Sequence, residues 1–532
     1  AETCDQSSHP GERRTLMGTA ARQRGSVLTA RQLLVAILFV AIFAMAVRQP
    51  ADTDTWWHLK SGQLMWESGQ ILRVDPFSHT VQGQPWINHS WLVQILLWPL
   101  YQALGLAGLA LLLATLVATS FALVYTQCEG KPFVAAFATL IGAVASSVIW
   151  AVRPQIVSLL LAALVAFLLD RYKRSGSSAW LWTLPLLVAL WVNCHGGFVI
   201  AFILMGCYLV GETLNRLTLP HFAGSALSQA ETGRTRLVPL GIVMLVSIPA
   251  VLLNPNTVKM LPYAYQTISI GQLQDFIQEW ASPDFHNLQF HPFIWLLLLM
   301  VAAMGLSRRR ADWTDLALVG LFGYMGLLAV RNIALFALIA PPVLSRHVVF
   351  AVDDLATASP RLSGLAALTH TLPSFRPRRV LVLINLFLLI MVMIGAGAKI
   401  ATDLLSLRDP KVWGEGLPLA AVEYLRNHDP PGSMFNSYNW GGYLIWSLYP
   451  DKPVFIDGRT DLYALNGATL EDYSQVHWVR PGWEEILSRY DTGFVVTEHT
   501  GLLDTMLAER PGWSVIHRDD LAVIYQRTES TP

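Results

Sequence analysis

Long apolar segments recur along most of the chain and alternate with short polar connections. A bilayer core about 30 Å thick needs roughly 17–25 apolar residues in each spanning helix, so this pattern predicts eleven membrane spans. The predicted spans are residues 31–48, 106–126, 132–150, 155–170, 179–194, 197–214, 237–253, 292–306, 314–330, 332–345 and 380–400. The first span follows several arginines and is interpreted as a signal anchor rather than a cleaved signal peptide.

Basic residues indicate how these helices are oriented, because lysine and arginine accumulate in cytoplasmic loops. The segment 90–104 is also apolar, but it is short and contains Pro99 and two tryptophans. If this segment does not cross the membrane, every basic cluster falls on the cytoplasmic side. We therefore predict that 65–104 forms two amphipathic helices on the outer surface, joined by a turn-rich segment.

The composition changes after Ile400, where short strand-like and helix-like segments begin to alternate. Strands are predicted at 433–436, 453–457 and 493–497 with a hairpin at 513–527, and helices at 417–427, 441–448, 483–490 and 502–509. This alternation is typical of a small soluble α/β domain.

The predicted fold class is mainly α. A polytopic transmembrane helical bundle at 31–400 contains the first outer loop, 49–105, with its two juxtamembrane helices, and a C-terminal soluble α/β domain at 401–532 follows outside. Residues 1–30 are predicted to be a disordered cytoplasmic tail.

The composition agrees with a membrane location and excludes some partners. Hydrophobic residues make up 53% of the chain and charged residues 14%, whereas soluble domains carry roughly 25% charged residues. The 37 basic and 37 acidic residues balance, which argues against a nucleic-acid partner. The four cysteines show no CxxC or metal-ligand spacing, so neither a disulfide framework nor a zinc site is expected.

Two carboxylates, Asp52 and Asp54, follow the first predicted span directly. Charged groups are costly at such a position, which points to chemistry at the membrane surface. One carboxylate can take the proton of an acceptor nucleophile, and the pair can hold a divalent cation such as Mg²⁺ or Mn²⁺. His58 would share a helical face with Asp54 as its proton partner. The alternatives are solvated loop carboxylates, a helix N-cap, and a structural hydrogen bond for His58.

Arg153 and Arg331 lie at the predicted outer ends of apolar helices, where the distribution of basic residues disfavours them. Guanidinium groups bind phosphates through paired hydrogen bonds, so we predict that they recognise the phosphate of a lipid carrier. The alternative is an arginine that contacts lipid headgroups. Asn193 and His195, followed by two glycines, end another helix on the same side. They are predicted donor contacts, against the alternative of a structural turn.

The remaining candidates also fall on the predicted non-cytoplasmic face. Glu279 supplies a second carboxylate and Trp280 a surface on which a sugar can stack, unless both are ordinary surface residues. Trp57 and His89 are further candidate contacts of the sugar or acceptor. The segment 457–461 either lines a ligand groove or forms a turn held by an Asp–Arg pair. Together these residues mark one active face.

This layout resembles the GT-C class of polytopic glycosyltransferases, which includes protein O-mannosyltransferases, aminoarabinose transferases and oligosaccharyltransferase catalytic subunits. Their first outer loop carries an acidic residue, and two juxtamembrane helices and many spans follow. The segments 52–59, 75–78, 193–197 and 440–444 resemble more closely a bacterial group with an Asp-x-Asp-x-Trp-Trp-His-Leu motif. The chain departs from well-characterised branches, since its first loop has no Asp-Glu pair and its outer domain no Trp-Trp-Asp motif.

The resemblance implies an inverting transferase in the bacterial inner membrane. It would move a sugar from a polyprenyl-phosphate donor to a protein, lipid or glycan acceptor on the periplasmic or extracellular face, with Asp54, or Asp52, as the base. One alternative is a non-catalytic subunit that keeps this scaffold within a larger membrane complex. A transporter is the weakest interpretation, because the ionisable groups gather at one surface and no internal repeat is evident.

Overall fold

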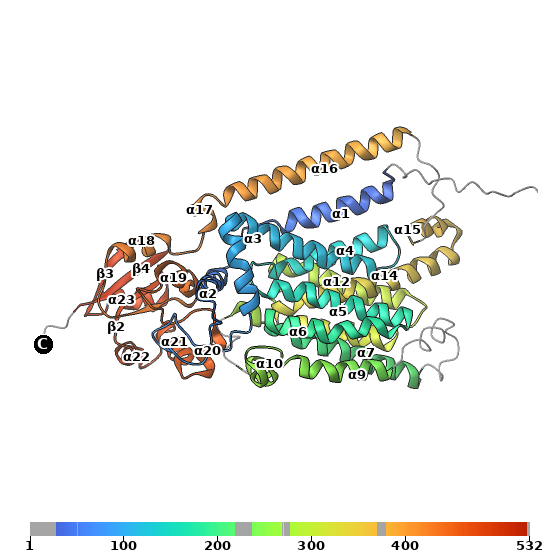
Figure 1. Ribbon diagram of the computed structural model, residues 1–532. Coiled ribbons are helices and arrows are strands. Elements are labelled where there is room, and N and C mark those ends of the chain that lie inside the picture. The colour runs from blue at the N-terminus through green and yellow to red at the C-terminus, as the bar shows by residue number, and fades with distance from the viewer. Residues whose placement is uncertain are drawn as a thin grey trace, which may run out of the picture.

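The computed structural model describes residues 28–49, 52–218, 237–268, 270, 277–369 and 379–528. A helical bundle forms most of the molecule, and a smaller domain that contains a four-stranded sheet lies at one end of it (Figure 1). The chain is therefore mainly helical, as predicted. Almost all of the predicted N-terminal tail lies outside the described residues.

Apolar helices with roughly parallel axes form the bundle (Figure 1). They are α1 (Ala30–Ala46), α3 (Trp91–Gln127), α4 (Phe133–Ser146), α5 (Gln155–Ser175), α6 (Leu184–Cys194), α7 (Val199–Thr218), α9 (Leu237–Ala250), α12 (His291–Leu306), α13 (Trp313–Leu328), α14 (Ile333–Ala358) and α16 (Arg379–Ser406). Among the described residues, 6 helical segments are long and apolar enough to cross a membrane, and shorter apolar helices accompany them. All of the predicted spans coincide with these helices, while the number that crosses a bilayer stays a prediction.

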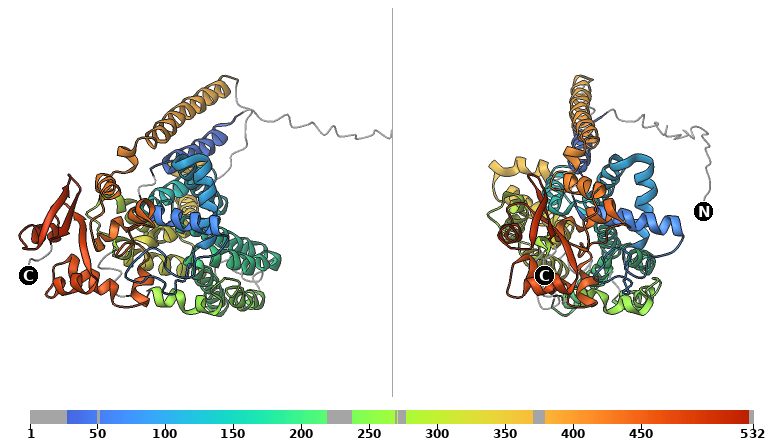
Figure 2. Two further views of the ribbon diagram at one scale, coloured as in Figure 1. Left: turned by 60° about the vertical axis from the view of Figure 1, so that its left-hand side comes forward. Right: turned by 90° about the vertical axis from the view of Figure 1, so that its left-hand side faces the viewer.

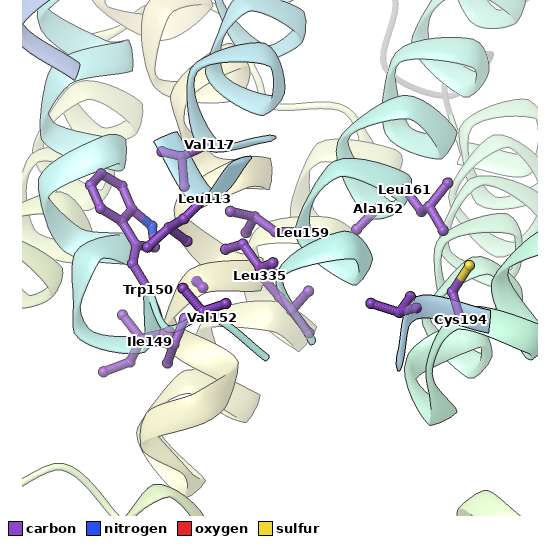
Figure 3. Packing of buried hydrophobic residues seen from close by; sticks show 14 of the residues in the cluster. Leu113, Val117, Ile149, Trp150, Val152, Leu159, Leu161, Ala162, Cys194 and Leu335 are labelled. Carbon is purple, nitrogen blue, oxygen red and sulfur yellow. The ribbon is translucent and has the colours of Figure 1, made fainter. Parts of the chain in front are cut away.

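Large apolar side chains fill the centre of the bundle, and small residues bring its helices together. Leu113 of α3, Trp150 after α4 and Leu335 of α14 are buried in one cluster (Figure 3). In a membrane, such side chains stabilise the bundle by close van der Waals packing, because lipid tails are as apolar as the side chains themselves. Gly142 of α4 faces α14, where an added Cβ would lie 2.7 Å from the Ala337 carbonyl oxygen. The glycine therefore allows the close helix contact that is typical of membrane bundles.

Helix α16 stands apart from the rest of the bundle. It leans away from the other helices (Figures 1 and 2) and packs mainly along α1. None of its most apolar stretch is buried. In a membrane, this helix would be surrounded largely by lipid, which accommodates apolar side chains as well as a protein core does.

Two helices of the first outer loop lie between the bundle and the C-terminal domain. They are α2 (Asp54–Ser68) and the part of α3 that precedes Gly105, where the backbone leaves the helical conformation at φ 60° and ψ −153°. The second coincides with the predicted helix at 90–104, while the location of both helices on the outer membrane surface stays a prediction. The first begins at Asp54 rather than Met65, because Asp52 Oδ1 accepts a hydrogen bond from the Asp54 amide at 2.9 Å. Helix α2 is also largely buried, since it packs against α3 and the C-terminal domain.

The C-terminal domain surrounds a mixed sheet with short helices. Its strands are β1 (Ser433–Asn436), β2 (Thr492–Glu498), β3 (Trp513–Arg518) and β4 (Ala522–Arg527), in the order β1-β2-β4-β3. Strands β1 and β2 are parallel, and the other pairs are antiparallel. The helices are α17 (Pro410–Trp413), α18 (Leu419–Asn427), α19 (Gly441–Leu448), α20 (Thr460–Leu465), α21 (Thr469–His477), α22 (Trp483–Arg489) and α23 (Leu502–Ala508). Most predicted elements of this domain are confirmed to within a few residues.

The predicted strand at 453–457 is wrong. This segment makes only an isolated bridge, between Val454 and Ser78 of the first outer loop. The Asn436 side chain takes the place of a neighbouring strand: its Oδ1 accepts from the Phe455 amide at 2.8 Å and its Nδ2 donates to the Ile456 carbonyl at 2.9 Å. The buried apolar segment is thus satisfied without joining the sheet.

Candidate active site

A cavity of about 760 Å³ lies where the bundle, the first outer loop and the C-terminal domain meet. Ten of the candidate residues from the sequence line it: Asp52, Asp54, Trp57, His58, His89, Arg153, His195, Glu279, Trp280 and Arg331. These residues come from widely separated parts of the chain, and the fold brings them to one place. The cavity is therefore the candidate active site.

Arg153 joins the carboxyl groups of the cavity. It lies in the bend between α4 and α5, and its Nε is 3.1 Å from Asp52 Oδ2. Its Nη1 donates to Asp54 Oδ2 at 3.0 Å, and its Nη2 contacts Glu279 Oε1. Three carboxyl groups thus share one guanidinium, and the side chain that was predicted to bind phosphate also holds the carboxylates in position.

The first turn of α2 fixes both aspartates. Trp57 is three residues after Asp54 and therefore on the same side of the helix, where its Nε1 donates to Asp54 Oδ1 at 3.0 Å. Since Asp52 Oδ1 binds the Asp54 amide, all four carboxylate oxygens have partners. Thr55 Oγ1 donates to the Val152 carbonyl at 2.9 Å and so ties α2 to the bend that carries the arginine.

Asp52 has an altered acidity. Burial raises the pKa of its carboxyl group to about 6; Arg153 opposes this shift, and the carboxylates of Asp54 and Glu279 reinforce it. A carboxyl group with this pKa changes its charge close to neutral pH.

The predicted divalent cation would have to compete with the arginine. Arg153 already contacts one oxygen of Asp52 and one of Asp54. In the part of the chain that the structure describes, no group of three or more His, Cys, Asp or Glu side chains could hold a metal ion. As arranged here, the pair does not fit a cation unless Arg153 moves.

His58 is held by a buried network of amides. Its Nδ1 lies 3.0 Å from Gln94 Nε2, and the other end of that amide accepts from Asn88 Nδ2 at 2.8 Å. An amide nitrogen only donates, so Nδ1 of His58 accepts and its proton is on Nε2. Burial, with Arg153 nearby, keeps the pKa of His58 well below its usual value. The hydrogen bond at Nδ1 agrees with the alternative that His58 makes a structural hydrogen bond. The Nε2–H group of the neutral ring remains as a donor.

His195 follows α6 and begins the next turn. Its Nδ1 accepts a hydrogen bond from the Gly197 amide at 3.1 Å, and Ser158 Oγ lies 2.9 Å from the same nitrogen. The neutral ring therefore carries its proton on Nε2, as a donor that suits an anionic ligand. Asn193 lies outside the lining: its Oδ1 accepts from Trp91 Nε1 at 2.9 Å, and its Nδ2 donates to the Leu253 carbonyl at 2.8 Å. This arrangement matches the structural alternative for Asn193.

Arg331 lies beside an aromatic ring instead of a carboxylate. Its guanidinium carbon is 4.2 Å from the centre of the Trp280 ring. Among the described residues, no carboxylate forms an ion pair with it. Trp280 directly follows Glu279, which contacts Arg153, so neighbouring residues connect the two arginines of the cavity. A guanidinium that lacks a carboxylate partner in a cavity is well suited to an anion.

The C-terminal domain closes one side of the cavity with residues 438–439 and 458–461. An added Cβ on Gly458 would lie 1.8 Å from Asp54 Oδ1, so the backbone packs directly on this carboxylate. Arg459 is 1% exposed and pairs with Asp457 at 2.7 Å and with Asp75 of the first outer loop at 2.5 Å. The predicted Asp–Arg pair of the segment 457–461 is therefore present, and residues 458–461 line the cavity; that the cavity binds a ligand stays a prediction.

Other lining residues had no signal in the sequence. Tyr263 of α10 (Met260–Ile268) and Tyr438 are ordinary polar residues in short helices. Only the glycine-containing segments 440–444 and 457–461 pointed to the C-terminal domain. No local pattern shows that this domain packs on the first outer loop.

The sequence matches no protein-family model and no curated protein. Solved structures are similar to it. The Archaeoglobus fulgidus oligosaccharyltransferase, tethered with an acceptor peptide that contains the NVT sequon, is 12% identical with a TM-score of 0.53, over 88% of this chain and 69% of that chain. Its apo form gives 13% identity, a TM-score of 0.50, and 88% and 70% coverage.

A third similar structure is ArnT from Cupriavidus metallidurans bound to undecaprenyl phosphate. It is 14% identical over 94% of this chain and 98% of that chain, with a TM-score of 0.46. At such identities, a structural likeness concerns the fold alone. The likeness to the oligosaccharyltransferase shows that this chain shares the fold of that protein over most of its length.

Proposed function

We propose that this protein is a glycosyltransferase that moves a sugar from a polyprenyl-phosphate donor to an acceptor on the non-cytoplasmic face of the membrane. The observation that carries the proposal is the single cavity that joins the Asp52–Asp54–Arg153–Glu279 cluster with Arg331. Carboxylates can activate an acceptor hydroxyl, and a guanidinium without a carboxylate partner can bind the phosphate of a donor.

The division of the lining supports a lipid-linked donor. Bundle helices contribute apolar side chains, namely Leu159, Val199, Ile200, Ile203 and Leu335, whereas the C-terminal domain contributes Tyr438, Asn439, Thr460 and Asp461. A polyprenyl phosphate joins a charged group to a long apolar chain. The apolar part of the cavity suits the chain, and the polar part suits a sugar and its acceptor.

In the proposed reaction, Asp54 takes the proton of the acceptor hydroxyl while the acceptor oxygen attacks the anomeric carbon. The bond from that carbon to the phosphate oxygen breaks in the same displacement, which inverts the configuration. Asp52 and Trp57 hold Asp54 in place. Arg331 and Arg153 stabilise the charge that develops on the departing lipid phosphate, an effect worth about 3 kcal/mol for each well-placed donor.

Substitution of Asp54 tests this proposal. Purified protein in lipid nanodiscs is supplied with a panel of labelled polyprenyl-phosphate sugars and with candidate protein, lipid and glycan acceptors. We expect Asp54→Asn to abolish transfer and keep the wild-type melting temperature. Asp451→Asn, an exposed residue of the C-terminal domain outside the cavity, is the matched control and should be fully active.

The outcomes separate the competing functions. Unchanged transfer by Asp54→Asn would remove the proposed base. A wild-type protein that transfers none of the sugars and co-purifies with other membrane proteins would favour the non-catalytic subunit. The same assay tests the predicted cation: loss of transfer with EDTA, restored by Mg²⁺ or Mn²⁺, would support it, and transfer that persists in EDTA would contradict it.

A further inference from the structure

Three polar side chains from distant segments form a hydrogen-bonded chain in the wall of the cavity. His89 belongs to the first outer loop, Tyr263 to α10, and Asp461 to the C-terminal domain. The tyrosine hydroxyl oxygen lies 2.7 Å from His89 Nδ1 and donates to Asp461 Oδ2 at 3.0 Å. A hydroxyl has one proton, so the same oxygen accepts from His89 Nδ1. The imidazole is thus connected through one hydroxyl to a carboxylate.

Opposing charges surround this imidazole. Asp461 and the Ile87 carbonyl favour its protonated form, whereas burial and Arg331 disfavour it, and burial is the largest effect. The neighbouring rings of His58 and His195, the latter with its centre 5.6 Å away, have pKa values well below the usual value, mainly through burial, and a positive charge on His89 would lower them further. The pKa of His89 is therefore below its usual value, and the ring is neutral at pH 7.

We propose that His89 takes up a proton when the phosphate of the lipid donor binds beside Arg331, and that it transfers this proton to the departing phosphate. The inference rests on the proposed function. The single negative charge of a bound phosphodiester offsets the positive charge of Arg331, which otherwise opposes protonation of the ring. Asp461 then stabilises the imidazolium through Tyr263. If this hydrogen-bonded chain only joined two domains, the Tyr263–Asp461 pair would be enough. The titratable ring of His89 would not be needed.

The proton balance of the transfer is complete. The bond from the acceptor oxygen to the anomeric carbon forms, the bond from that carbon to the phosphate oxygen breaks, and its electron pair stays on the phosphate. The acceptor proton moves to Asp54, and the proton on His89 moves to the phosphate oxygen. The protein thus gains one proton and loses one, and no oxidant or reductant is needed.

Calorimetry with a simple probe tests the proton uptake. Geranyl methyl phosphate is a phosphodiester with a short isoprenoid chain, and its single negative charge does not titrate between pH 5 and 9, so any proton taken up goes to the protein. The full chain in nanodiscs is titrated at pH 7 in PIPES and in Tris, whose ionisation enthalpies differ. We expect the wild type to take up a substantial fraction of a proton, His89→Gln to take up much less, and the exposed-residue control His428→Gln to behave like the wild type.

The pH dependence and a second variant sharpen the test. Wild-type affinity should fall as pH rises, by up to about tenfold per pH unit between the free and bound pKa values of His89. The affinity of His89→Gln should depend much less on pH. Tyr263→Phe keeps the ring, breaks the link to Asp461 and should reduce the uptake. Equal uptake in wild type and His89→Gln, or probe binding without uptake in the wild type, overturns this inference and leaves the donor site intact. A wild type that does not bind the probe overturns both.

Discussion

Replacing Gly458 with alanine places a methyl group against the Asp54 carboxylate. The new Cβ would lie 1.8 Å from Asp54 Oδ1 and 2.8 Å from its Cγ. Ordinary contacts begin near 3.4 Å, so one side must move by about 1.6 Å. The carboxylate yields poorly, because Trp57 holds one of its oxygens and Arg153 the other. The C-terminal domain resists as well, because the buried Arg459–Asp75 pair ties it to the first outer loop.

This displacement sets the expected size of the effect. Extra methyl groups in a packed interior cost typically about 1–3 kcal/mol, and we expect Gly458→Ala to lower the free energy of unfolding by that amount. A catalytic group that is misplaced by about 1 Å costs roughly 100-fold in rate. Sugar transfer should therefore fall by about two orders of magnitude.

Thermal unfolding of four proteins identifies the clash: the wild type, Gly458→Ala, Asp54→Ala and the double variant. Since Asp54→Ala removes the carboxylate, the second substitution should cost little in that background, with a coupling of about 1–2 kcal/mol. Gly206→Ala in α7, where no heavy atom lies within 4 Å of the added Cβ, is the control and should not destabilise the protein. An equal cost of Gly458→Ala in both backgrounds would refute the direct contact.

Two further predictions concern the electrostatics of the same region. The pKa of Asp52 in the folded protein, about 6, lies above the usual value for an aspartate, near 4. Protonation of Asp52 therefore stabilises the folded protein. This contribution is complete below about pH 4 and is lost as the pH rises through 6. The neutral variant Asp52→Asn should thus melt higher than the wild type at pH 7.5 and like it at pH 4; a pH-independent difference would contradict this. Arg459→Met leaves two buried carboxylates without their partner and should cost about 3–5 kcal/mol, seen as a lower melting temperature and faster proteolysis of the C-terminal domain. Arg480→Met on the surface of that domain should have neither effect.

The helical bundle was predictable because the length and apolarity of a helix are local properties. The eleven predicted segments coincide with apolar helices for this reason. The prediction that Asp54, Arg153 and Arg331 fall on the same face needed only the alternation of spans. Local signals failed where tertiary contacts decide the structure. The segment 453–457 has the composition of a buried strand, yet the Asn436 side chain makes the hydrogen bonds that a neighbouring strand would make.

The candidate site was predictable only in part, for a similar reason. Charged residues at the ends of apolar helices are conspicuous, so Asp52, Asp54, Arg153 and Arg331 could be identified from the sequence. Tyr263 had no signal in the sequence, and the segment 457–461 gave no indication that its last residue, Asp461, is linked through Tyr263 to His89. No residue pattern within either segment indicates that the two meet at His89, so the hydrogen-bonded chain required the structure.

The contacts of the C-terminal domain make it a structural part of the cavity rather than an appended module. Gly458 touches the Asp54 carboxylate, Asp461 is linked to His89 through Tyr263, and the Arg459–Asp75 pair fixes both contacts relative to the bundle. A domain that only recruited an acceptor would need none of these contacts at the two ionisable groups. Because the same domain contacts both, a displacement of the domain would change the position of Asp54 and the environment of His89 together. Acceptor activation and phosphate departure would then depend on the same docked state.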